Sequence, residues 1–211
     1  MSRAPTSSQP GSVIVISAPS GTGKTTLVTR LLRAVPRLRF SVSHTTRPPR
    51  RGERNGREYY FVARREFERM AARGDFVEWA EVYGNLYGTS WTALRRAQRA
   101  GHDVLLDIDV QGHRQVRKRL PEAVSIFLLP PSYDELERRL RRRHSDAPEN
   151  IERRLADARR EVRRWREYDF LVVNDAIVAA DSALKIVVSA AGLRRTVQQD
   201  RAREIVKSFG G

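Results

Sequence analysis

Residues 13–32 read VIVISAPSGTGKTTLVTRLL, and this stretch decides the fold. The apolar run at 13–16 predicts a buried parallel strand, and residues 24–34 have the pattern of a helix. A glycine-rich turn joins the two, so that the N–H groups and the dipole of the helix N-terminus would face an anion. The order of strand, turn and helix predicts a phosphate-binding loop in an α/β protein. The loop consists of Ala18, Pro19, Ser20, Gly21, Thr22, Gly23, Lys24 and Thr25.

The individual loop residues suit a nucleotide phosphate. Gly21 and Gly23 allow the backbone to curl around phosphate oxygens, and Lys24 places a point charge on the β and γ phosphates. The Thr25 hydroxyl suits Mg²⁺. Only four of the 40 basic residues are lysines, and a compact ammonium fits this position better than a planar guanidinium. Ala18 stands where the pattern usually begins with glycine, so we expect its φ to be negative.

The composition predicts a single core. At 211 residues and 40% hydrophobic, the chain can bury one α/β core with small inserted lobes. No apolar stretch reaches the ~20 residues of a membrane span, and the first residues hold no apolar signal core. We therefore expect a cytoplasmic protein without membrane association. The sequence has no cysteine, which excludes disulfides and thiolate metal sites.

The formal net charge of +15 is consistent with two classes of partner, acidic small molecules and nucleic acid. The arginines of residues 135–143 and 149–167 are interleaved with glutamates, which is the pattern of solvated, salt-bridged helix faces. This pattern favours small anionic ligands over specific nucleic-acid binding.

Strands and helices alternate along most of the chain. This order predicts a parallel sheet with right-handed crossovers and with ligands at the carboxyl ends of the strands. Further core strands are expected at 103–108, 124–129 and 170–173. Core helices are expected at 92–100, 111–119, 132–143, from after 150 to about 168, and at 181–190.

A different pattern separates the first core strand from the later ones and predicts a small inserted β-rich lobe. A short strand at 40–43 leaves the core, and a hairpin signal, Asn55-Gly56, follows. Within the lobe we expect strands at 59–61 and 76–82 and a helix at 65–73. The resulting division is a disordered tail at 1–11, the nucleotide-binding core at 12–41 and 90–190, the inserted lobe at 42–89, a lid at 141–156 and a C-terminal extension at 191–211.

Several motifs between residues 13 and 175 agree with one family. They read SAPSGTGKTT, FSVSHTTRPPRRGE, NGREYYF, FVEWAEVYGNLYGT, LLDIDVQG, IERRL and VVND. Through these motifs the chain resembles the guanylate kinases. The resemblance implies a P-loop NTPase three-layer α/β fold with a central parallel sheet, an inserted small β-rich GMP-binding lobe and a helical lid. It also implies transfer of the γ-phosphoryl group of ATP to GMP and dGMP, with Mg²⁺, giving ADP and GDP in purine nucleotide metabolism and GMP recycling.

The resemblance implies that Arg47, Arg50, Tyr59 and Tyr87 hold the phosphate of GMP, and it counts Arg47 and Lys24 as catalytic. Arginine binds a phosphate monoester in bidentate fashion, and tyrosine hydroxyls donate hydrogen bonds without adding charge. The alternatives are solubilising charges in an exposed turn for the arginines and ordinary lobe packing for the tyrosines.

For guanine, the resemblance implies contacts from Ser43, Glu78 and Thr89. One carboxylate can accept from guanine N1–H and N2–H₂ together, whereas adenine would leave that carboxylate underpaired. A surface carboxylate is the alternative for Glu78. Asp107 matches a further GMP-site residue, oriented toward Mg²⁺, its waters or the acceptor. Asp109 has a weaker case, because a helix N-cap explains it equally well.

On the donor side, the resemblance places Arg139, Arg143 and Arg154 at the transferring phosphoryl group. Phosphoryl transfer depends on positioning and positive charge, so no general base is required. Surface charge is the alternative for each of these arginines. His144 replaces a glycine that is common after the lid arginine, which affects the expected hinge. Asn174 matches a position beside the adenine of ATP, with a turn as its alternative.

Three other functions are alternatives to a kinase of GMP with ATP as its second substrate. The first, a non-catalytic binding module, conflicts with an intact loop that retains Lys24 and Thr25. The second is a kinase of another phosphorylated acceptor, such as a ribose bisphosphate, and Glu78 favours a nucleobase monophosphate instead. The third is a nucleic-acid binder, which binding at physiological salt would reveal.

Overall fold

The computed structural model describes residues 11–142 and 148–209. Its centre is a five-stranded sheet in the order β2-β7-β1-β8-β9, with every neighbouring pair parallel. The middle strand is the apolar run before the loop, and all five of its residues are buried. The strands are β1 (Val13–Ser17), β2 (Leu38–Phe40), β7 (Asp103–Asp107), β8 (Val124–Leu129) and β9 (Phe170–Val173).

Helices cover both faces of this sheet and make three layers. Successive side chains of a strand point to opposite faces, so Ile14 and Ile16 meet α1 and α7, while Val13 and Val15 meet α3 and α4. This double burial explains why the core strands are apolar without alternation. The helices are α1 (Lys24–Ala34), α3 (Trp91–Arg99), α4 (Val110–Arg119), α5 (Tyr133–Arg141), α6 (Pro148–Glu161) with the 3₁₀ turn η1 (Val162–Glu167), and α7 (Ile177–Ala191).

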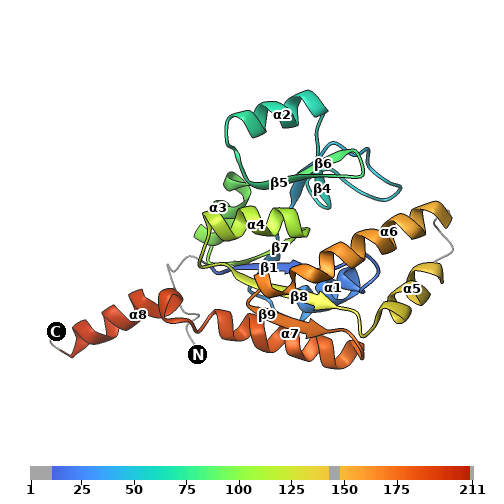
Figure 1. Ribbon diagram of the computed structural model, residues 1–211. Helices are drawn as coiled ribbons and strands as arrows, with labels where there is room; N and C mark the ends of the chain where they lie inside the picture. Colours follow the sequence, from blue (N-terminus) through green and yellow to red (C-terminus); the bar gives the residue numbers. More distant parts are fainter. Residues whose placement is uncertain (1–10, 143–147, 210–211) are drawn as a thin grey trace.

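A second sheet forms the lobe drawn above the core in Figure 1. Its strand order is β4-β3-β6-β5, and α2 (Arg64–Ala72) packs on it through Phe67, which stacks on Phe76 with ring centroids 4.4 Å apart. The strands are β3 (Ser43–Thr45), β4 (Tyr59–Phe61), β5 (Phe76–Val82) and β6 (Asn85–Ser90). We call this sheet together with α2 the acceptor lobe. It meets the core where β5 runs beside α4.

Two sequence-based expectations about this lobe were wrong, and one of its strands was not expected. The Asn55-Gly56 signal does not make a hairpin, because β3 and β4 pair in parallel and Asn55 Oδ1 instead accepts a hydrogen bond from the backbone N–H of Phe61. The strand expected at 40–43 is two strands in two sheets, β2 and β3. Strand β6 was not expected, because its sequence NLYGTS contains little apolar periodicity. It is stabilised by pairing with both β3 and β5.

The other core elements lie where the sequence predicts them, within a few residues. The exception is α7, which begins at Ile177 rather than near residue 181. Helix α8 (Arg195–Ser208) extends away from the body at the C-terminal end (Figure 1). Within 11–142 and 148–209, no helix has both the length and the apolar character needed to cross a membrane.

Candidate active site

The loop after β1 has the backbone geometry expected of a phosphate cradle. Gly21 and Gly23 have φ values of 91° and 95°, and the N–H of Thr22 donates to the carbonyl of Pro19 at 3.2 Å. Such φ values strongly favour glycine. Ala18 is not among the described residues with positive φ, as expected for its place in the loop.

Two neighbours fix the loop from the outside. The buried side chain of Asn174, just after β9, donates from Nδ2 to the carbonyl of Thr22 at 2.7 Å. Arg139 on α5 donates to the carbonyl of Asn174 at 3.2 Å, and its Nε donates to Glu135 at 2.6 Å. A Cβ at Gly23 would lie 2.7 Å from Asn174 Nδ2, so the close approach of this amide also requires glycine.

Lys24 and Asp107 form an ion pair at the carboxyl edge of the core sheet. Strands β1 and β7 are parallel neighbours with Ile16 opposite Asp107, which brings the ends of both strands together. The side chains of Lys24 and Asp107 are 23% and 21% exposed, so both can be reached by a ligand. Asp109, two residues on, caps α4 by accepting from the N–H groups of Gln111 and Gly112.

Arg154 approaches the loop from the lid side. From α6 its Nε and one terminal nitrogen donate to Ser20 Oγ at 2.9 and 2.7 Å. Arg139 from α5 reaches the same loop, where it donates to the carbonyl of Thr22 at 3.5 Å and to that of Asn174. Two guanidinium groups therefore contact the loop where nucleotide phosphates would bind. Arg143 and His144 lie outside the described residues.

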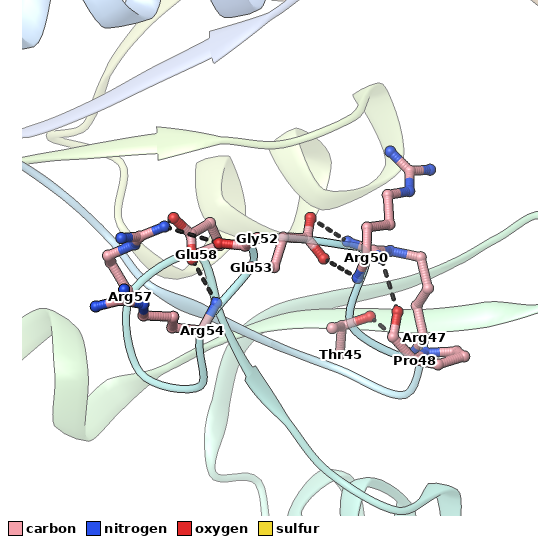
Figure 2. Close-up of polar contacts among 9 residues, drawn as sticks. All are labelled: Thr45, Arg47, Pro48, Arg50, Gly52, Glu53, Arg54, Arg57 and Glu58. Carbon is pink, nitrogen blue, oxygen red and sulfur yellow. Dashed lines mark hydrogen bonds and ion pairs between the residues drawn. The ribbon is translucent and has the colours of Figure 1, made fainter. Parts of the chain in front are cut away.

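Arg47 and Arg50 lie in the turn after β3, and Glu53 connects them (Figure 2). One oxygen of Glu53 accepts from the Arg47 guanidinium at 2.8 Å, and the other accepts from the backbone N–H of Arg50 at 2.7 Å. The hydrogen bond from Arg47 lowers the pKa of Glu53 and raises the pKa of Arg47. The Arg50 guanidinium is exposed and extends away from the other side chains drawn.

Tyr59 and Tyr87 stand beside these arginines. Their rings meet edge to face with centroids 5.8 Å apart, and the Arg47 guanidinium carbon lies 5.5 Å from the centroid of Tyr59. The Tyr59 hydroxyl is protonated at neutral pH and can donate a hydrogen bond, and burial raises its pKa further. The structure thus brings the side chains of Arg47, Tyr59 and Tyr87 together, while Arg50 lies in the same turn with its guanidinium exposed.

Glu78 is a buried carboxyl group in the acceptor lobe, only 3% exposed. Burial raises its pKa to about 7, against the opposing effect of a hydrogen bond from Thr89. Ser43 Oγ lies 3.3 Å from Thr89 Oγ1, so the three proposed guanine contacts form one polar cluster. A surface carboxylate, the alternative considered for Glu78, is ruled out by this burial.

Sequence reasoning missed Gly112, which makes room for that carboxyl group. A Cβ built at Gly112 would lie 2.6 Å from Glu78 Oε2 and 3.3 Å from its carboxyl carbon. In the sequence, Gly112 is merely a glycine inside an expected helix. Glu53 was missed as well, although its spacing from Arg47 and Arg50 is a local signal that could have indicated the ion pair.

We expect Gly112→Ala to impair the guanine contact that the resemblance assigns to Glu78. The new methyl group must displace the Glu78 carboxyl group, which should lower kcat/KM for GMP by about 10- to 100-fold, with the KM for ATP little changed. Steady-state kinetics with each substrate varied in turn would measure this. Gly192→Ala is the matched control, because a Cβ there meets only ordinary contact at 3.6 Å. Equal kinetics for both variants would contradict the packing argument.

No group of three or more His, Cys, Asp or Glu side chains in the described part of the chain gathers to hold a metal ion. Two oxygen donors suited to a hard cation are the exposed Thr25 hydroxyl in the loop and the Asp107 carboxylate paired with Lys24.

Comparison with known proteins agrees with this arrangement. A family model described as guanylate kinase matches residues 11–191. The chain belongs to the guanylate kinase family. The guanylate kinase of Neisseria meningitidis is 53% identical over 188 residues, which cover 89% of this chain and 92% of that protein. The guanylate kinase of Chromobacterium violaceum is 50% identical, with 95% of each chain covered.

A solved structure supports the same family. The crystal structure of guanylate kinase from Anaplasma phagocytophilum matches with a TM-score of 0.71 at 33% identity, covering 92% of this chain and 96% of that one. Guanylate kinases are ATP-dependent kinases of GMP, and members of this class generally require a divalent metal ion. The expected fold class and enzyme class are therefore confirmed, and a non-catalytic binding module is not supported.

Proposed function

We propose that this chain transfers the γ-phosphoryl group of ATP to GMP and to dGMP, and that it thereby serves purine nucleotide metabolism and GMP recycling. The observation that carries the proposal is the buried Glu78 carboxyl group, in the same lobe as Arg47 and the two tyrosines. A carboxylate kept from water is suited to accept from N1–H and N2–H₂ of guanine, because a base without those donors leaves it unpaired.

The acceptor phosphate is assigned to Arg47, Arg50, Tyr59 and Tyr87. Arg47 is already oriented by Glu53 and by the Tyr59 ring, while the exposed Arg50 guanidinium can turn toward a ligand. Ser43, Thr89 and Asp107 complete the GMP site of this proposal.

ATP is assigned to the loop residues 18–25 and to Asn174. When ATP binds, its β and γ phosphates would replace Asp107 as the partner of Lys24. The Asp107 carboxylate would then be free to contact the acceptor. Arg139 and Arg154 contact the loop and would stabilise the charge on the transferring group. Arg143 keeps its proposed catalytic role, and it lies outside the described residues.

The metal is proposed to be Mg²⁺, held by the Thr25 hydroxyl, phosphate oxygens and water. Hydroxyl and phosphate oxygens are the hard donors that this ion prefers, and Thr25 is the exposed residue that follows Lys24. When bound, the ion neutralises charge on the β and γ phosphates. The cytoplasmic location expected from the sequence stays a prediction.

An ADP-release assay tests this proposal with purified full-length protein, ATP and Mg²⁺. We expect turnover with GMP and dGMP, a very low rate without acceptor, and loss of activity in EDTA that returns with added Mg²⁺. Chromatography should show GDP and ADP in equal amounts. ADP release that does not depend on a guanine acceptor would contradict the proposal.

A further inference from the structure

Tyr83 occupies a strained position at the tip of the β5–β6 hairpin. Its φ is 51°, and it is the only non-glycine residue with positive φ in 11–142 and 148–209. Gly84 follows with φ of 79°, so the two-residue loop has positive φ at both positions. Loops of this kind favour Asn-Gly, and a bulky aromatic residue at the first position is disfavoured. Such backbone strain persists where contacts of the surrounding structure hold the residue in place, which is common at functional sites.

The side chain of Tyr83 contacts α6. Its hydroxyl donates to Asp157 Oδ2 at 3.3 Å, and the Arg153 guanidinium carbon lies 4.5 Å from the centroid of its ring. Asp157 also pairs with Arg160, which fixes the carboxylate on the helix. A cation over an aromatic face and a hydroxyl on a carboxylate together make a specific contact. The hairpin tip is therefore attached to one side of α6.

This contact joins two parts of the proposed site. Arg153 is followed by Arg154, whose guanidinium donates to Ser20 in the phosphate-binding loop. A groove of about 490 Å³ separates the rest of the hairpin from α6, and its lining includes Tyr83, Asp109 and Asp157. Tyr83 lines this groove and contacts α6, so the position of the acceptor lobe is linked to that of the helix carrying Arg154.

We propose that Tyr83 is a positioning residue that fastens the acceptor lobe to α6 and so holds Arg154 at the loop during phosphoryl transfer. The inference rests on the proposed function, because it concerns the geometry of the GMP-bound site. Tyr83 itself touches neither nucleotide in this account. Its contribution is to reduce the freedom of the lobe and the helix relative to each other.

Tyr83→Asn separates this role from a merely structural one. Asparagine suits positive φ, so the variant should unfold at the same temperature as wild type or higher. The contacts with Arg153 and Asp157 are lost, and we expect kcat/KM for GMP to fall about tenfold, mainly through kcat. The KM for ATP should change by less than about twofold, because the loop and Asn174 remain intact.

Two further variants test the specific contact. Tyr83→Phe keeps the ring over Arg153, so its kcat/KM for GMP should fall less than that of Tyr83→Asn. Asp157→Ala should show the same fall as Tyr83→Phe. In the variant that combines Tyr83→Phe with Asp157→Ala, kcat/KM for GMP should fall no further than in either single variant, since both changes remove the same hydrogen bond. Glu81→Gln is the control, because Glu81 lies on the same hairpin but pairs with Arg64 inside the lobe. We expect wild-type kinetics for it.

The outcomes distinguish this inference from the proposed function. A wild-type protein that fails to phosphorylate GMP would refute the proposed function. An active wild type with unchanged kcat/KM for GMP in Tyr83→Asn would refute the positioning role alone. The positioning role would also be refuted if the losses of kcat/KM for GMP in Tyr83→Phe and Asp157→Ala were strictly additive in the double variant.

Discussion

Lys24→Ala should lower kcat by at least about 10³-fold while leaving the fold intact, because the variant removes the charge that is placed on the β and γ phosphates. The ion pair with Asp107 is lost too, but it is partly exposed and contributes little to stability. ADP release at saturating substrates measures the first effect, and thermal unfolding followed by circular dichroism measures the second.

Lys185→Ala is the control for this experiment. Lys185 also forms an ion pair with an aspartate, Asp181, on α7 and away from the loop. We expect wild-type kcat for it. If Lys24→Ala retained kcat within about threefold of wild type, the assigned role of the loop would be wrong.

Glu78→Gln should have the second large effect. We expect it to lower kcat/KM for GMP and to raise the free energy of unfolding. A glutamine can accept from one guanine donor while its NH₂ group opposes the other, so kcat/KM for GMP should fall by about 10²- to 10⁴-fold. The KM for ATP should be unchanged. Steady-state kinetics with GMP varied would measure the loss, with Glu81→Gln as the matched carboxylate control. An unchanged kcat/KM for GMP would place guanine recognition elsewhere.

The stability of the same variant follows from the pKa of Glu78, which burial raises to about 7. A raised carboxyl pKa means that the folded state binds the proton more tightly than the unfolded state, so stability is lost as pH rises through about 7. Glutamine removes this cost. Without ligand at pH 8, we expect the free energy of unfolding of Glu78→Gln to exceed that of wild type by about 1–3 kcal/mol. At pH 5 the difference should be smaller. Urea denaturation at both pH values would test this.

The wild-type protein should show the matching pH dependence. Guanine N1–H and N2–H₂ need the ionised carboxylate, and the pKa of Glu78 lies near 7. The KM for GMP should therefore rise as pH falls below 7, by up to about tenfold per unit, while the KM for ATP follows a different profile. In Glu78→Gln this dependence should vanish. A persistent rise in the variant would assign it to another group, such as the GMP phosphate.

The core of the fold was predictable because its signals are local. An apolar strand, a glycine-rich turn and a helix at residues 13–34 specify the loop without reference to the rest of the chain. The Lys24–Asp107 ion pair was not predicted, because Lys24 belongs to the helix after the loop and only the folded loop brings it to Asp107 at the end of β7.

The acceptor lobe was less predictable because its structure depends on tertiary pairing. Strand β6 has little apolar alternation and is specified by its two partners, and the parallel pairing of β3 with β4 leaves no local signature. The close approach of Gly112 to Glu78 joins α4 to β5 across 34 positions of sequence, which residue types alone do not reveal. The contact of Tyr83 with Asp157 on α6, 74 positions along the chain, likewise leaves no local signal.

The most direct test of the account compares kcat/KM of the wild-type protein for GMP, IMP and AMP under identical conditions. IMP keeps N1–H but lacks the 2-amino group, and AMP offers neither donor to Glu78. The account predicts the order GMP, then IMP, then AMP, with AMP lower than GMP by at least about 10⁴-fold. Comparable values for AMP and GMP, or no turnover with any of the three, would contradict it.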